Sequence, residues 1–193
     1  GRNAKDFGET AYKLALGGCP LIKDDHSLFN QSYAPFKDRV KACVDSVNNA
    51  NAKTGGRSLY IANCTADSME FLERAMTAQE LGAGGIMAAP GLLGLSIIRE
   101  LSSAPDFHLP IFLHPCFSGP LVLSADSGVS PFCYYGQFSR LAGADAAIFT
   151  SFGGRFPFTE EVCRKICDGT ETEMGGLRSI FPVPSGGMKW QLF

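Results

Sequence analysis

Residues 21–26, with the sequence LIKDDH, begin as an apolar run and end as a cluster of charge. Side chains of a strand alternate between its two faces, so Lys23 and Asp25 are expected on one face, and Ile22 and Asp24 on the other. A lysine and a carboxylate side by side, next to a histidine, are costly to bury and poor at building a core. Taken alone, these residues leave two interpretations open: a salt-bridged strand end or a site for chemistry.

The composition is that of a globular protein and excludes several classes. The chain has 193 residues, of which 45% are hydrophobic and 19% are charged. A net charge of -2 without a basic run argues against nucleic-acid partners, and no apolar stretch has the length of a membrane span. The seven cysteines are odd in number and irregularly spaced, without a CxxC pair, which favours free thiols in the reducing cytoplasm and gives little support to a zinc site.

Hydrophobic patterning predicts strands at about residues 21, 59, 85, 110, 146 and 180, which alternate with helices. Asn3 is the expected N-cap of a helix over residues 4–16. The first strand is expected over residues 21–25 and the last over residues 179–183. A helix capped by Asp67 or Ser68 is predicted to bury a face made of Met69, Leu72, Met76 and Leu81. The alternation implies a parallel sheet with helical crossovers, and polar and Gly-rich residues follow each strand, where such folds house their chemistry.

Two architectures fit six strand–helix units. An open doubly wound sheet would expose flat edges, but no G-x-G-x-x-G sequence follows the first strand. Candidate functional residues follow nearly every strand, as on the ring of loops of a TIM (β/α)₈ barrel. We therefore predict that residues 1–193 form a single partial TIM-barrel domain, without the first and eighth strands. Exposed sheet edges would invite association as a homo-oligomer, a dimer or higher.

Several stretches resemble the large subunit of RuBisCO, in its C-terminal barrel domain. Residues 18–26 look like the RuBisCO sequence G-x-D-F-x-K-D-D-E, and residues 142–145 (AGAD) match the entry to the sixth barrel strand. Residues 182–187 (PVPSGG) are similar to the stretch through the seventh strand. His114-Pro115 followed by Ser118-Gly119 looks like the HPxxSG stretch of RuBisCO-like enolases. The resemblance covers the whole chain and is closer to these RuBisCO-like proteins, which do not fix carbon dioxide.

The resemblance implies a metal-dependent mechanism. Lys23 would carry CO2 as a carbamate and, with Asp25 and His26, would hold Mg²⁺, which stabilises an enolate of a phosphorylated sugar or sugar acid. The family has a glutamate where this chain has His26. Imidazole is neutral and softer, which makes Mn²⁺ or Zn²⁺ more plausible here, or gives His26 an acid–base role instead.

Further site residues follow from the same resemblance. His114 is a catalytic candidate, and a phosphate would be bound by Ser185, Gly186, Gly187 and Arg155. For His114 and Arg155 the alternatives are a structural histidine and a surface arginine. Gly186 and Gly187 would let backbone N–H groups approach an anion, although a simple Gly-rich turn has the same sequence.

Departures from the family's pattern argue against fixation of CO2. RuBisCO has an H-x-H-R stretch at the fifth barrel strand, whereas residues 114–117 read HPCF without an arginine, and residues 149–151 (FTS) replace His-Ser-Gly. The resemblance thus favours enolisation, isomerisation or decarboxylation in a longer parent protein in the cytoplasm. The isolated chain is expected to be inactive, because its match lacks part of the family's site. The alternatives are a non-catalytic, self-associating remnant or a true carboxylase relative.

Overall fold

The computed structural model describes residues 2–124, 126–154 and 157–186. Strands and helices alternate along these residues, so the predicted α/β class and the six strands are confirmed. The chain divides into two compact units. The first comprises Gly1–Met87 and Pro105–Pro110, and the second comprises Ala88–Ala104 and Ile111–Phe193.

In the first unit, three parallel strands are joined by helical crossovers. The strands are β1 (Leu21–Lys23), β2 (Leu59–Asn63) and β3 (Gly85–Ala88, the last residue of which belongs to the second unit), and the helices are α1 (Ala4–Leu16), α2 (Phe36–Thr54) and α3 (Ser68–Glu80). Strand β2 lies between β1 and β3, with Lys23 opposite Ile61 and Asn63 opposite Met87. The carboxyl ends of β1 and β2 therefore lie at the same edge.

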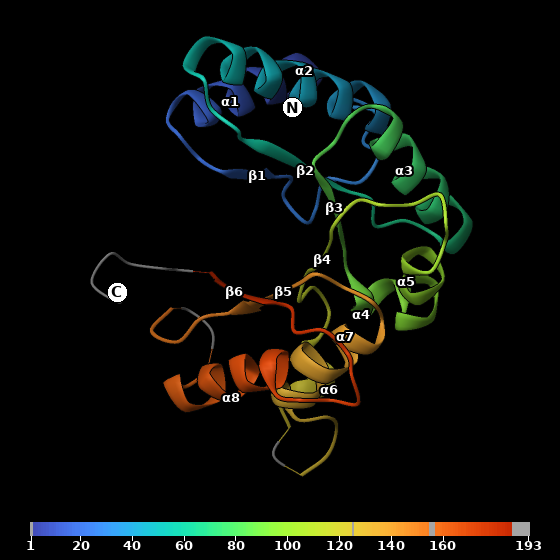
Figure 1. Ribbon diagram of the computed structural model, residues 1–193, viewed down its shortest axis with the longest axis vertical. Helices are drawn as coiled ribbons and strands as arrows, with labels where there is room; N and C mark the ends of the chain where they lie inside the picture. Colours follow the sequence, from blue (N-terminus) through green and yellow to red (C-terminus); the bar gives the residue numbers. More distant parts are fainter. Residues whose placement is uncertain (1, 125, 155–156, 187–193) are drawn as a thin grey trace. The chain divides into compact units, whose positions relative to one another are not determined.

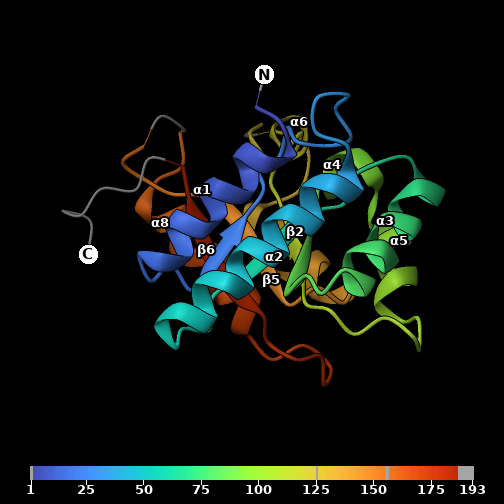
Figure 2. The same ribbon diagram turned by 90° about the horizontal axis from the view of Figure 1, so that it is seen from above.

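Helix α1 forms where the sequence predicts it, because its first turn is capped locally. The Asn3 side chain accepts a hydrogen bond from the Asp6 N–H (3.1 Å), and the Asp6 carboxylate accepts one from the Asn3 N–H (2.9 Å). Helices α1 and α2 lie side by side (Figures 1 and 2). A Cβ atom added at Gly8 would lie 2.9 Å from the carbonyl oxygen of Ala42, so the glycine permits this close approach.

In the second unit, three parallel strands are again joined by helices. The strands are β4 (Ile111–Leu113), β5 (Ala146–Thr150) and β6 (Phe181–Ser185), and the helices are α4 (Pro90–Leu93), α5 (Leu95–Ser102), α6 (Gly119–Val122), the π-helix η1 (Phe132–Phe138), α7 (Ser139–Leu141) and α8 (Glu160–Glu171). Strand β5 lies between β4 and β6, with Leu113 opposite Ala147 and Thr150 opposite Ser185.

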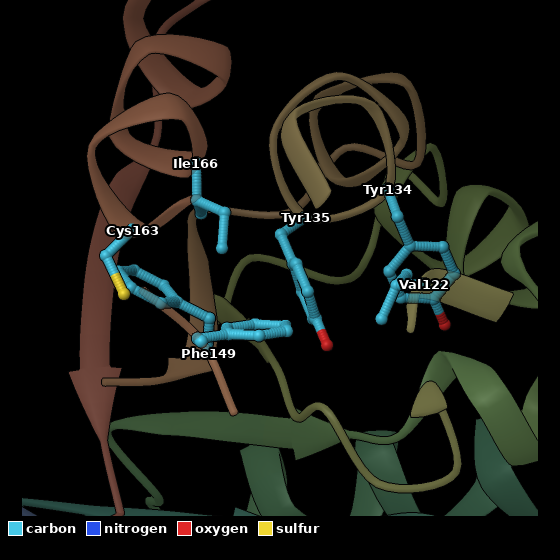
Figure 3. Close-up of a cluster of buried hydrophobic side chains, with 7 residues drawn as sticks. Val122, Tyr134, Tyr135, Phe149, Cys163 and Ile166 are labelled. Atoms are coloured by element: carbon cyan, nitrogen blue, oxygen red, sulfur yellow. The ribbon is translucent and has the colours of Figure 1, made fainter. Parts of the chain in front are cut away.

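A cluster of buried side chains joins η1, α8 and β5 in the second unit. Figure 3 shows Tyr135 between Phe149 of β5 and the pair formed by Tyr134 and Val122. The Tyr134 and Tyr135 rings pack edge to face with centroids 5.2 Å apart. This cluster fixes η1 against the sheet.

Three sequence-based expectations need correction. Strand β1 ends at Lys23 rather than Asp25, and β6 starts later and extends to Ser185 rather than ending at Val183. The predicted inner face of α3 is wrong, because Met69 is 71% exposed and the buried residues of this helix are Phe71, Arg74, Ala75 and Ala78.

The face of α3 differs from the apolar pattern because Arg74 turns inward. Its guanidinium donates to the carbonyl of Thr65 (2.9 Å) and to the carboxylate of Glu70 (2.6 Å), and it lies 5.5 Å from the centroid of the Phe36 ring. These partners let a charged side chain take a buried position that periodicity assigns to apolar residues.

Candidate functional site

Lys23 stands at the carboxyl end of β1 on the exposed side of the strand. Ile22 and Asp24 are buried, whereas Lys23 and Asp25 are exposed, as the alternation in the sequence predicts. The Lys23 Nζ atom donates to the carbonyl of Asp24 (3.0 Å). Lys23 as a whole is exposed, but its amine is partly buried, and this partial burial lowers the pKa of Lys23 and outweighs the opposing charges of Asp25 and Asp24. A lowered pKa increases the fraction of neutral, nucleophilic amine.

Asp25 and His26 follow directly and lie together. The Asp25 Oδ1 atom accepts hydrogen bonds from the N–H and the hydroxyl of Ser27, at 2.9 and 2.6 Å. These two bonds lower the pKa of Asp25 and keep it ionised. The His26 Nδ1 atom lies 3.6 Å from the same Asp25 oxygen. The structure thus places Lys23, Asp25 and His26 within one short exposed segment.

Asp24 points in the opposite direction, into the protein, and is fully engaged there. Its carboxylate accepts hydrogen bonds from Tyr60 Oη (2.5 Å), Asn63 N–H (3.0 Å) and Arg39 Nε (3.3 Å). Burial raises the pKa of Asp24, and the Arg39 charge and these hydrogen bonds oppose the rise. Asp24 therefore anchors the segment, and its two neighbours face outward.

Arg39 and Asn63, which were not predicted as site residues, hold this segment. Arg39 has an exposed fraction of 0% and donates to the carbonyls of Leu28 (3.3 Å) and Phe29 (3.1 Å). The Asn63 side chain reaches the same segment from the end of β2. A polar residue that ends the apolar run of residues 59–63 is the one local sign of this role.

The donor set around Lys23 fits a metal only in part. Within residues 2–124, 126–154 and 157–186, no group of three or more His, Cys, Asp or Glu side chains could hold a metal ion. Asp25 and His26 provide one carboxylate and one imidazole. A carbamate on Lys23 would add hard oxygen donors beside them, which is the type of ligand that Mg²⁺ and Mn²⁺ take.

In the second unit, His114 follows β4. Its Nδ1 atom accepts a hydrogen bond from the Cys116 N–H (3.1 Å), and its own backbone N–H donates to Ala88 O (2.8 Å). Because Nδ1 is an acceptor here, the neutral imidazole carries its proton on Nε2. His114 thus lies at the carboxyl end of β4, the end where parallel α/β folds house their chemistry.

The loop after His114 is held in a strained conformation. Phe117 has a φ of 63° and an exposed fraction of 64%, and among the described residues it is the one non-glycine with a positive φ. The Ser118 hydroxyl is 2.6 Å from Pro115 O and 2.7 Å from Tyr135 Oη of the π-helix. A Cβ atom added at Gly91 would lie 2.6 Å from the carbonyl oxygen of Cys116, so the backbone of α4 packs closely against this loop.

The candidate phosphate-binding residues are only partly described. Ser185 ends β6, and its hydroxyl donates to Phe149 O (3.0 Å), while its carbonyl accepts from the Ser151 N–H (2.7 Å). Gly186 follows with a φ of 79°, a conformation that favours glycine. Gly187 and Arg155 lie outside the described residues. With the Ser185 hydroxyl engaged, backbone N–H groups after β6 are the donors that an anion could use.

Comparisons with known proteins cover nearly the whole chain. Residues 1–192 match the family model of the ribulose bisphosphate carboxylase large chain, catalytic domain. A 2,3-diketo-5-methylthiopentyl-1-phosphate enolase of Bacillus pumilus is 36% identical over 188 residues, which are 97% of this chain and 46% of that protein. A 5-methylthioribulose-1-phosphate isomerase of Rhodospirillum rubrum is 34% identical over 94% of this chain and 47% of its own length. The chain thus spans about half the length of these relatives.

Solved structures give the same result for the fold. A rubisco-like protein from Alicyclobacillus acidocaldarius matches with a TM-score of 0.91 and 33% identity, over 100% of this chain and 48% of that chain. A dimeric archaeal Rubisco from Hyperthermus butylicus matches with a TM-score of 0.85 and 26% identity, over 97% of this chain and 47% of that chain. These matches confirm the predicted incomplete (β/α)₈ barrel and exclude the open doubly wound sheet. The chain belongs to the family of the ribulose bisphosphate carboxylase large chain, as a relative of its RuBisCO-like members.

Proposed function

We propose that this chain carries the metal centre of a RuBisCO-like enzyme that enolises or isomerises a phosphorylated sugar or sugar acid and does not fix CO2. The observation that carries the proposal is the segment at the end of β1. There, Lys23 has a lowered pKa and stands exposed beside an ionised Asp25, while Asp24 is locked inside. The names of the related enolase and isomerase support this class of reaction.

Lys23 has the first role in the proposal. Its neutral amine would attack CO2 and release a proton to solvent, and the oxygens of the resulting carbamate, with Asp25 and His26, would hold the metal. A bound Mg²⁺, or Mn²⁺ or Zn²⁺ favoured by the imidazole, would polarise a keto oxygen and stabilise the enolate that forms when the neighbouring carbon loses a proton. The hydrogen bonds from Ser27 orient the Asp25 carboxylate for this role.

His114 and the end of β6 would bind the substrate. We assign His114 to substrate binding, because it follows β4 at the carboxyl end of the strand and its ring is held by the Cys116 N–H. We assign the phosphate to backbone N–H groups at Gly186 and Gly187, near Ser185, with Arg155 as a further contact. Strands β5 and β6 are neighbours, so residues that follow them would act at one edge of the sheet.

Phe117 argues against a bisphosphate substrate. RuBisCO has an arginine in the corresponding H-x-H-R stretch, whereas this loop presents an exposed aromatic ring that no phosphate would pair with. This difference supports a substrate with a single phosphate. It also disfavours the alternative that the protein is a true carboxylase.

A second candidate is decarboxylation or C–C cleavage of a 3-oxo sugar-acid phosphate, which would use the same enolate. A third is a non-catalytic, self-associating remnant. The grouping of Lys23 with Asp25 and His26 at the carboxyl end of β1 favours a reactive site over the remnant.

The remaining properties concern assembly and location. We propose a homo-oligomer, a dimer or higher, because a matched family member is described as dimeric. No helix within the described ranges is long and apolar enough to cross a bilayer. All seven cysteines are unpaired with one another, which supports a reducing cytoplasmic location.

Proton exchange tests the proposed reaction. The complete gene product is incubated in D2O with CO2, Mg²⁺ or Mn²⁺, and a panel of phosphorylated keto sugars, and NMR follows deuterium at the carbon next to the carbonyl. We expect exchange with the wild type, loss with Lys23→Met, and retention with the exposed control Lys41→Met. Exchange that survives Lys23→Met, or that is absent from the wild type across the panel, would contradict the proposal. Residues 1–193 alone should give no turnover.

A further inference from the structure

Asn63 is a buried amide directed at the segment that carries the candidate metal ligands. It ends β2 and has an exposed fraction of 1%. Its Nδ2 atom donates to the carbonyls of His26 (3.0 Å) and Leu28 (3.1 Å), and the Asp25 carbonyl lies at 3.4 Å. One side chain thus holds three carbonyls of a segment more than 30 positions earlier in the sequence.

The rest of Asn63 fixes the orientation of that amide. Its Oδ1 atom accepts from the Thr65 N–H (3.2 Å), and its backbone N–H donates to the Asp24 carboxylate (3.0 Å). Oxygen and nitrogen of the amide therefore have different partners and cannot exchange places without the loss of these bonds. Asn63 joins the buried anchor Asp24 to the exposed segment that follows it.

The chemistry of the position suits an amide better than the alternatives. Carbonyl oxygens surround Nδ2, so a carboxylate at this position would repel them, and an apolar side chain would remove the hydrogen bonds that Nδ2 donates. Arg39 already supplies charged donors to Leu28 O and Phe29 O from α2. The amide adds donors at His26 and Asp25, which Arg39 does not reach in the structure.

We propose that Asn63 is a positioning residue for the metal centre. By holding the carbonyls of Asp25, His26 and Leu28, it fixes the directions of the Asp25 carboxylate and the His26 imidazole. The inference rests on the proposed function. Outer partners that orient metal ligands typically contribute about 10–100-fold to metal affinity.

Asn51 provides a matched control in the same unit. Its Nδ2 atom donates to Ser58 O (2.9 Å) and its Oδ1 atom accepts from the Ser58 N–H (2.9 Å), so it also clamps backbone with an amide. It acts at the start of β2, however, whereas Asn63 acts at its end. Removal of either amide costs hydrogen bonds, but only Asn63 touches the segment of the ligands.

The experiment measures Mn²⁺ binding by electron paramagnetic resonance in the presence of CO2, with the complete gene product. We expect Asn63→Ala to weaken Mn²⁺ binding by about 10–100-fold, Asn63→Ser to have a smaller effect in the same direction, and Asn51→Ala to leave binding unchanged. In the metal-free protein, hydrogen exchange at the amides of Ser27 and Leu28 should accelerate in Asn63→Ala and not in Asn51→Ala.

The outcomes separate the inference from the proposed function. If the wild type binds no Mn²⁺ with CO2 supplied, the proposed function and the inference both fail. If the wild type binds, and Asn63→Ala and Asn63→Ser bind as tightly as Asn51→Ala, the inference fails and the proposed function stands. If Asn63→Ala does not fold, Asn63→Ser decides by the same comparison with Asn51→Ala.

Discussion

Asp24 and Asp25 are adjacent and chemically identical, yet the structure gives them opposite roles, and the substitutions Asp24→Asn and Asp25→Asn test this difference. Asp24 is buried against Arg39, Tyr60 and Asn63. Asp25 is exposed and bonded to Ser27. Each substitution removes one negative charge and preserves the size of the side chain.

The expected magnitudes follow from what each substitution leaves behind. Asp24→Asn leaves the guanidinium of Arg39, with an exposed fraction of 0%, without its carboxylate, and breaking a buried ion pair in this way costs about 3–5 kcal/mol. The raised pKa of Asp24 does not conflict with this loss of stability, because a single buried charge without a partner destabilises the fold more than a buried ion pair does. In Asp25→Asn the amide oxygen still accepts from Ser27 at the surface, so a change of about 0.5 kcal/mol or less is expected.

Urea unfolding followed by circular dichroism measures both variants of the complete gene product. Against a total stability of about 5–15 kcal/mol, the predicted loss for Asp24→Asn is large and moves the midpoint strongly. Asp25→Asn should keep the wild-type midpoint and lose Mn²⁺ binding. The assignment of Asp24 as the anchor is wrong if the free energy of unfolding of Asp24→Asn lies within about 1 kcal/mol of the wild-type value, which is less than the range for a broken buried ion pair. It is also wrong if both variants lose the same stability.

Three further predictions concern pH, helix packing and the loop after β4. When reductive methylation is measured as a function of pH, the amine of Lys23 should react with a midpoint below pH 10.5, because burial favours its neutral form. Lys165, which is paired with Glu161, should react with a midpoint above pH 10.5. Equal midpoints would contradict the cause assigned to the lowered pKa of Lys23. Gly136→Ala should cost about 1–3 kcal/mol, because its Cβ would lie 2.4 Å from the Gly169 carbonyl carbon, while Gly119→Ala, with its nearest neighbour at 3.5 Å, should be tolerated in the same thermal unfolding assay. A double-mutant cycle of Ser118→Ala and Tyr135→Phe should give a coupling free energy of about 0.5–1.5 kcal/mol for the 2.7 Å hydrogen bond between the two side chains. Additive effects of the two substitutions on the free energy of unfolding would show that the π-helix does not hold the loop.

Local chemistry made part of this structure predictable. Asn3 and Asp6 cap α1 through bonds three residues apart, so the start of that helix can be read from the sequence. The outward direction of Lys23 and Asp25 follows from strand alternation, which continues past the end of β1. Both results depend only on neighbours in the chain.

The parts that the sequence did not reveal depend on distant contacts. Asp24 accepts a hydrogen bond from Asn63, which is 39 positions away in the sequence. Ser118 forms a hydrogen bond with Tyr135, which lies in a π-helix. The apolar pattern of the sequence did not indicate the wider turn of this helix. The face of α3 was predicted incorrectly because Arg74 finds partners in Thr65 and Glu70 that allow it inside. Hydrophobic periodicity does not register such bonds.

The central claim is that Lys23 becomes a carbamate that completes the metal centre. The most direct test is ¹³C NMR of the complete gene product with ¹³CO2 and Mg²⁺, with Lys23→Met as the control. The account predicts a carbamate resonance in the wild type that depends on the metal and is missing from Lys23→Met. An unmodified Lys23 amine at saturating CO2 and Mg²⁺ would contradict it.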